Sequence, residues 1–213
     1  MSKAQRQARL AELRDAQERA DRRRRRLMIL IGALVAAALV IPAAVIITGE
    51  QRRQADEESS LQEALEQPLP GVVEVPEQDA THVLEDIEYG TLLPPMGGPH
   101  DPVWQDCGFY DAPVRNENAV HSLEHGAVWI AYSESLPDDD VAVLRDLVTE
   151  HSYLLVSPYP ELSSALVATA WGVQLELDDV DDERLAVFVA RYLQGPQTPE
   201  PGAACSGGTA ATV

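Results

Sequence analysis

The run "HSLEHG", residues 121–126, holds the residue types best suited to chemistry in this 213-residue chain. His121 and His125 stand four positions apart, with Glu124 beside them. On a short helix this spacing places both imidazoles on one face, where they can bind one metal ion. A hydrogen-bonded structural role and proton transfer without a metal are the alternatives.

A metal site needs more ligands than this pair. His100, at the end of the proline- and glycine-rich stretch "PPMGGPH", is the expected third ligand, and Met96 in the same stretch could be a soft ligand. Glu124 could bind the ion directly or orient a histidine. Imidazole suits both copper and zinc, and a methionine would favour copper. The sequence therefore predicts a copper or zinc site at His100, His121 and His125, with Met96 and Glu124 as further candidates.

The same run also spells H-x-x-E-H, a zinc-protease motif in which two histidines bind the ion and the glutamate is the general base. Glu124 is therefore the candidate catalytic residue of an alternative zinc hydrolase. Against this, Gly126 should end the helix early, whereas the protease motif lies within a long helix. The remaining histidines, His82 and His151, fall in expected regular secondary structure, and we assign them no role in the site.

The segment from Leu27 to Ile47 contains 21 residues and no charge. At about 1.5 Å rise per residue it would span about 30 Å, the thickness of a bilayer core. Ten basic residues precede it and two follow closely, at Arg52 and Arg53. This asymmetry predicts a single-pass anchor at 27–48, with a basic tail, 1–26, in the cytoplasm and the rest of the chain outside the cell membrane.

From residue 54 onward the chain carries four arginines against 30 acidic residues. So acidic a surface argues against nucleic acid as a partner. The expected partners are the membrane itself and another membrane protein or enzyme. The chain contains two cysteines, Cys107 and Cys205, and an even number outside the membrane predicts a disulfide. That bond would tie the C-terminal tail to the loop that carries His100.

The charged and proline-containing stretch 49–78 is expected to be a linker, followed by an α+β domain over 79–213. Periodicity predicts helices in "PDDDVAVLRDLVTEHS" and "DDVDDERLAVFVARYLQG". It predicts strands in "HVLEDIEYG", "GAVWIAY", "YLLVSPYP" and "SALVATAWGVQLEL", the last bent at Gly172. The expected fold is a mainly antiparallel sheet with helices on one face, resembling a split βαβ arrangement.

The motifs PP-x-G-G-P-H and V-H-S-L-E-H-G, with "SPYP", "ATAWG" and "PEPGAACSGG", resemble an uncharacterised family of actinobacterial membrane-anchored proteins, catalogued as a domain of unknown function. The resemblance runs from Tyr89 to Gly208. It implies one anchor and an extracytoplasmic domain, and it brings no established activity. Its motif positions in this chain are His100, Cys107, Tyr110, Glu117, His121, Glu124 and His125.

These observations favour a membrane-anchored extracytoplasmic domain that binds copper or zinc for metal handling or sensing. A metal-free structural or interaction subunit of a membrane complex is the first alternative. A zinc hydrolase that uses Glu124 is the weaker one.

Overall fold

The structure, a computed structural model, describes residues 3–160 and 162–213. Within the first helix, α1 (Lys3–Glu66), it describes the side chains of residues 17, 19, 21–32, 34, 38 and 48–66. The chain divides into two units, 1–59 and 60–213. The second unit contains the end of α1, and Arg191 donates hydrogen bonds there to the carbonyl oxygens of Ala64, Leu65 and Gln67.

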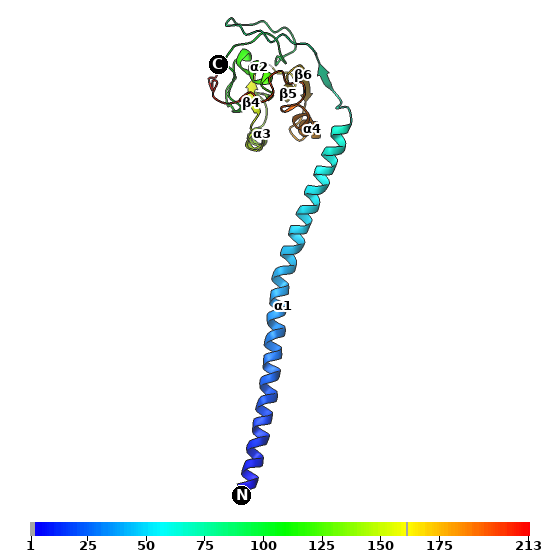
Figure 1. Ribbon diagram of the computed structural model, residues 1–213, viewed down its shortest axis with the longest axis vertical. Coiled ribbons are helices and arrows are strands. Elements are labelled where there is room, and N and C mark those ends of the chain that lie inside the picture. The colour runs from blue at the N-terminus through cyan, green and yellow to red at the C-terminus, as the bar shows by residue number, and fades with distance from the viewer. Residues whose placement is uncertain (1–2, 161) are drawn as a thin grey trace. The chain divides into compact units, whose positions relative to one another are not determined.

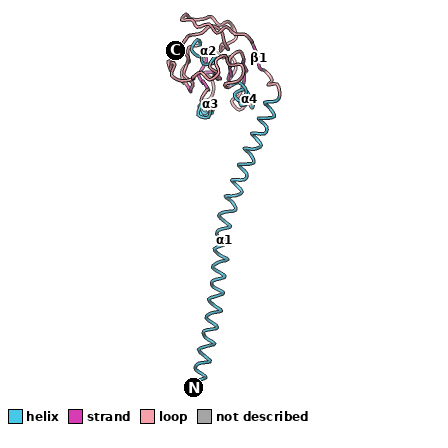
Figure 2. Tube along the Cα trace, viewed as in Figure 1, coloured by secondary structure: helices cyan, strands magenta, loops and turns pink. Residues whose placement is uncertain are grey.

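The second unit is built around a six-stranded sheet with the order β1-β6-β5-β3-β4-β2. Figure 1 shows its elements along the chain, and Figure 2 shows how much of the unit is loop. The strands and the remaining helices are β1 (Val72–Glu74), β2 (Gly108–Phe109), α2 (Asn116–Glu124), β3 (Val128–Ser133), α3 (Asp138–Glu150), β4 (Leu154–Tyr159), β5 (Leu166–Ala170), β6 (Val173–Leu177) and α4 (Glu183–Tyr192).

The sheet is mixed, so the expectation of a mainly antiparallel sheet is confirmed only in part. β1–β6, β6–β5 and β5–β3 pair antiparallel, whereas β3–β4 and β4–β2 pair parallel. The reason is α3, because a helix between β3 and β4 gives a connection long enough to return the chain in the same direction. β3 and β4 are direct neighbours, so the βαβ unit is not split.

Helices cover both faces of the sheet, not one as expected. Val128 and Ile130 of β3 face a core formed with Leu144 of α3 and Phe188 of α4. Trp129 and Ala131 of β3, with Leu155 of β4, face α2 through Ala119, Val120 and Leu123. Figure 1 shows α2 on one side of the strands and α3 and α4 on the other. We call α2 and the residues that pack with it on this face of the sheet the α2 layer, and the candidate site belongs to it.

Three expectations about strands are also corrected. The stretch "HVLEDIEYG" forms no strand, only one isolated bridge between His82 and His100. The stretch "SALVATAWGVQLEL" is the hairpin β5–β6, because Gly172 adopts φ +69°, a turn conformation. A side chain at Gly172 would also lie 2.9 Å from the carbonyl oxygen of Val75. The stretch 49–78, expected to be a linker, includes β1, which pairs with β6.

The expected membrane anchor, 27–48, falls within α1. In the part of the chain that the structure describes, no helix combines the length and the apolar composition that a bilayer crossing requires. Most side chains of the expected span, 27–48, lie outside the described residues. The anchor therefore stays a prediction.

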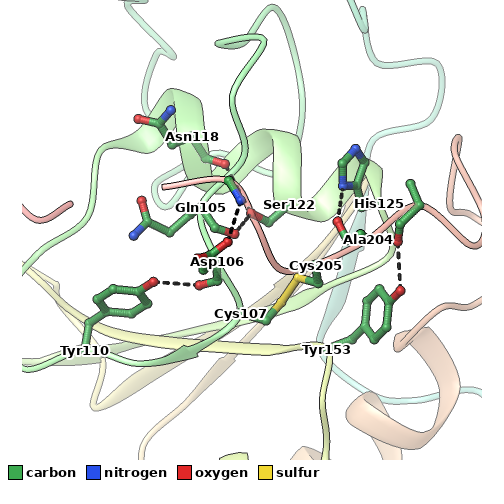
Figure 3. Close-up of a disulfide and its surroundings, with 12 residues drawn as sticks. Gln105, Asp106, Cys107, Tyr110, Asn118, Ser122, His125, Tyr153, Ala204 and Cys205 are labelled. Atoms are coloured by element: carbon green, nitrogen blue, oxygen red, sulfur yellow. Dashed lines mark hydrogen bonds between the residues drawn. A yellow bond between two sulfur atoms is a disulfide. The ribbon is translucent and has the colours of Figure 1, made fainter. Parts of the chain in front are cut away.

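The expected disulfide between Cys107 and Cys205 is confirmed, and it joins two segments that are 98 residues apart. Figure 3 shows it where the C-terminal tail crosses the loop before β2. Around it the tail is held by backbone hydrogen bonds from Cys107 to Cys205 and from Asp106 to Thr209. The hydroxyl of Tyr153 donates to the carbonyl of Ala203, so the tail is part of the folded unit.

We expect the double substitution Cys107→Ser and Cys205→Ser to lower the free energy of unfolding. A loop of this length gives an upper value of about 4 to 5 kcal/mol by chain entropy. Urea denaturation of the oxidised wild type and of the variant measures the difference. The reduced wild type should behave like the variant, and equal stability of all three would show that the tail is held without the bond.

Candidate metal centre

α2 presents two faces because its apolar residues recur at helical spacing. Ala119, Val120 and Leu123 pack on the sheet, so His121 and Glu124 are turned toward the loops that cover the helix. The N-cap residue of α2 is Arg115, and its side chain makes no capping bond. Gly126 ends α2 with φ +97°, as the sequence predicted.

His100 reaches α2 from the buried proline-glycine loop. The ring nitrogen Nδ1 of His100 donates to the carbonyl oxygen of Gly98 over 2.8 Å. The loop needs glycine at residue 97, where φ is +152° and a side chain would collide with Gln78. This backbone places the imidazole of His100 in a fully buried position beside Glu124.

His82 is brought to the same place by backbone pairing. Its neighbour Val83 donates to the carbonyl of His100 over 2.7 Å, and His100 donates to the carbonyl of Thr81 over 3.0 Å. The two rings meet edge to face, with centroids 4.8 Å apart. His82 is therefore a member of the site that the sequence analysis missed, and no local pattern around it indicates this role.

Four side chains converge at this point: His82, His100, His121 and Glu124. From the Glu124 oxygen Oε2, the nearest ring nitrogens Nε2 lie at 2.9 Å in His100, 3.5 Å in His82 and 3.9 Å in His121. One ligand atom from each residue lies within 4.8 Å of all the others. This arrangement could hold a metal ion.

The hydrogen bonds of two rings determine which nitrogen is free. A carbonyl oxygen can only accept, so Nδ1 carries the proton in His100, bonded to Gly98, and in His121, bonded to Asp101 over 2.6 Å. In the neutral rings Nε2 then has a free lone pair, and in both residues it faces Glu124. Histidines that bind metals are commonly oriented by such a bond at the other nitrogen.

The carboxylate of Glu124 also needs a partner. Glu124 is buried, and its oxygen Oε2 faces the ring nitrogens of three histidines. A buried carboxylate that is not paired with a positive charge or a donor is costly. A hydrogen bond to an imidazole, such as the contact of 2.9 Å with Nε2 of His100, or a metal cation can meet this need.

Arg115 supports the surrounding loops. Its guanidinium contacts three carboxylates, in Asp101 at 2.7 Å, Asp86 at 3.0 Å and Glu117 at 3.2 Å. The other oxygen of Glu117 accepts a hydrogen bond from the backbone of Ile87. This network fixes the backbone at Asp101, whose carbonyl orients His121.

His125 lies next to the cluster and points elsewhere. Its Nδ1 donates to the carbonyl of Ala204, and its Nε2 lies 3.6 Å from Glu200 Oε2. The ring still contacts that of His121, with centroids 4.5 Å apart. Met96 is buried, and its carbonyl accepts a bond from Gly172. The ligand roles predicted for both residues stay predictions.

Comparison with known proteins identifies the family. The family model described as "Protein of unknown function (DUF3105)" matches residues 81–207, and the chain belongs to this family. The matched region begins one residue before His82 and ends two residues after Cys205. No curated protein and no solved structure matches the chain significantly.

The buried state of His121 gives the metal-free domain a pH dependence. Burial, as the main cause, lowers the pKa of His121 to about 4, although its bond to Asp101 acts in the opposite direction. An unfolded histidine titrates near pH 6.5. Between these values the unfolded chain binds more protons at His121, so stability should fall as the pH falls from about 6.5 to about 4. Urea denaturation across this range measures the fall.

The substitution His121→Asn is the matched variant, because an asparagine amide can still donate to the carbonyl of Asp101. It should lose less stability than the wild type over the same pH range. If both proteins lose the same amount, the pH dependence arises from other groups.

Proposed function

We propose that this DUF3105 protein is a single-pass membrane protein whose external domain binds one copper or zinc ion. The ligands are His82, His100, His121 and Glu124, and the function is metal handling or sensing. The observation that carries the proposal is the convergence of three imidazole nitrogens on one buried carboxylate, two of them with Nδ1 already bonded to a carbonyl.

The ligand chemistry restricts the ion. Three imidazoles and one carboxylate are a ligand set that suits Zn²⁺ and Cu²⁺. Thiolate ligands would favour Cu⁺, but both cysteines of the chain are joined in the disulfide and cannot bind an ion as thiolates. We therefore expect a divalent ion.

The zinc hydrolase alternative gains little from the geometry. In H-x-x-E-H proteases both histidines bind the same ion. Here Nε2 of His121 faces Glu124, whereas Nε2 of His125 faces Glu200. Glu124 lies within reach of three imidazoles, which suits a ligand more than a base that must approach a water molecule.

Two observations support the membrane topology. Large apolar side chains at residues 27–31 and at Leu34 are exposed on α1, which is costly in water and favourable in lipid. The disulfide is typical of proteins outside the cytoplasm.

The full-length protein should bind one Zn²⁺ or Cu²⁺ per chain in calorimetry at neutral pH. His100→Ala and His121→Ala should each lower the affinity at least about 100-fold, because each removes a buried ligand. Glu124→Gln should also lower it strongly, because a neutral amide replaces a charged ligand of the ion.

The controls are His151→Ala, at the end of α3, and Glu200→Gln, a carboxylate outside the cluster. Both should bind like the wild type. If the wild type binds neither ion, the site is a hydrogen-bonded structural cluster. That result would favour the alternative of a metal-free structural or interaction subunit.

The orientation is tested separately. Protease added to intact cells without a wall should degrade residues 60–213, because the basic tail keeps the N-terminus in the cytoplasm. A tag fused to the N-terminus should survive the treatment until the cells are lysed. Protection of the C-terminal unit in intact cells would show the opposite orientation.

A further inference from the structure

The four residues of the cluster differ sharply in exposure. The side chain of His82 is 44% exposed, whereas that of His100 is 0% exposed and those of His121 and Glu124 are nearly as buried. An ion bound by all four residues would therefore be shielded on three sides by buried ligands. The solvent side would be covered by one imidazole.

His82 is also the least firmly held of the three histidines. The rings of His100 and His121 are fixed by hydrogen bonds from Nδ1 to carbonyl oxygens. Among the described residues, none accepts such a bond from His82. Its ring stacks on that of His121, with centroids 4.7 Å apart, and its backbone is paired only at Thr81 and Val83. The imidazole can turn away from the cluster while the other ligands keep their places.

The chain segment that carries His82 is strongly acidic. Between residues 74 and 88 the chain has no lysine or arginine and six exposed acidic residues, which are Glu74, Glu77, Asp79, Glu85, Asp86 and Glu88. Arg115 neutralises Asp86 in part, and the other five remain acidic. Such a concentration of one charge attracts oppositely charged ions and raises their rate of association.

The other side of the cluster is closed. His125 lies beyond His121 and is buried, and its Nδ1 donates to Ala204, next to the disulfide-bonded Cys205. Figure 3 shows this bond between His125 and the tail. Trp104 packs against the rings of both His121 and His125. An ion could leave on this side only if the tail moved.

We propose that His82 is a displaceable ligand and that the ion exchanges on its side. This inference rests on the proposed function and adds the side of the site from which the ion enters and leaves. In the exchange step a nitrogen or oxygen donor of an acceptor molecule forms a bond to the ion as the bond to Nε2 of His82 breaks. No electron is transferred, and His100, His121 and Glu124 still hold the ion at that stage. The partner is a chelating acceptor, such as a protein with its own imidazole or carboxylate ligands.

The test measures how fast the full-length protein in detergent, loaded with one Zn²⁺ per chain, gives the ion to the coloured chelator 4-(2-pyridylazo)resorcinol. In the wild type the rate should rise with chelator concentration, because the chelator takes part in the substitution. His82→Ala should still bind one ion and should release it at least about tenfold faster. Glu200→Gln, which leaves every residue of the cluster and the disulfide in place, should release it at the wild-type rate.

Three results would overturn the inference while leaving metal binding intact. The first is an unchanged release rate in His82→Ala. The second is equally faster release in Glu200→Gln. The third is a loss of binding in His82→Ala as complete as that in His100→Ala. A wild type that binds no Zn²⁺ would instead reject the proposed function. Circular dichroism of each variant confirms that it is folded before the rates are compared.

Discussion

The buried carboxylate of Glu124 is the constraint on which the α2 layer depends. A carboxylate away from water is stable only beside a positive charge or a set of donors, and the chain surrounds this one with three imidazoles from three different segments. The proline-glycine loop supplies His100, the backbone pairing of residues 81–83 supplies His82, and α2 supplies His121. The apolar face of α2 packs on the sheet, so it does not by itself bring these three segments together.

The fold keeps these ligands in place through contacts outside the cluster. Carbonyl oxygens orient two of the rings, Arg115 ties three acidic side chains together, and the disulfide fixes the tail beside His125. Such arrangements lower the cost of ordering ligands when an ion binds. Among the described residues, His82 is the one histidine of the cluster whose ring makes no hydrogen bond to a carbonyl oxygen, which connects the rigidity of the site with the direction of exchange that we propose.

The sequence predicted the elements whose signals are local. Periodicity predicted the helices α3 and α4 and the strands β3 and β4. The even number of cysteines predicted the disulfide between Cys107 and Cys205. The same sequence did not predict β1 or the mixed sheet, because these depend on pairing between distant residues. The β5–β6 hairpin is a local pairing across Gly172, which the sequence analysis interpreted as a bend within one strand. The runs "VWIAY" and "LLVSP" are apolar without alternation, which is typical of strands covered on both faces. That signal could have indicated helices on both sides.

Spacing alone did not show where two histidines would lie. His121 and His125 have the helical spacing of a ligand pair, but α2 ends at Glu124, and His125 is already its C-cap residue. The ring of His125 therefore bonds to the tail, and the helical pair that enters the cluster is His121 with Glu124. His82 has no helical partner and joins through a single backbone bridge to His100. Three members of the cluster, His100, His121 and Glu124, stand in motifs of the sequence, whereas His82 enters the cluster only through the fold.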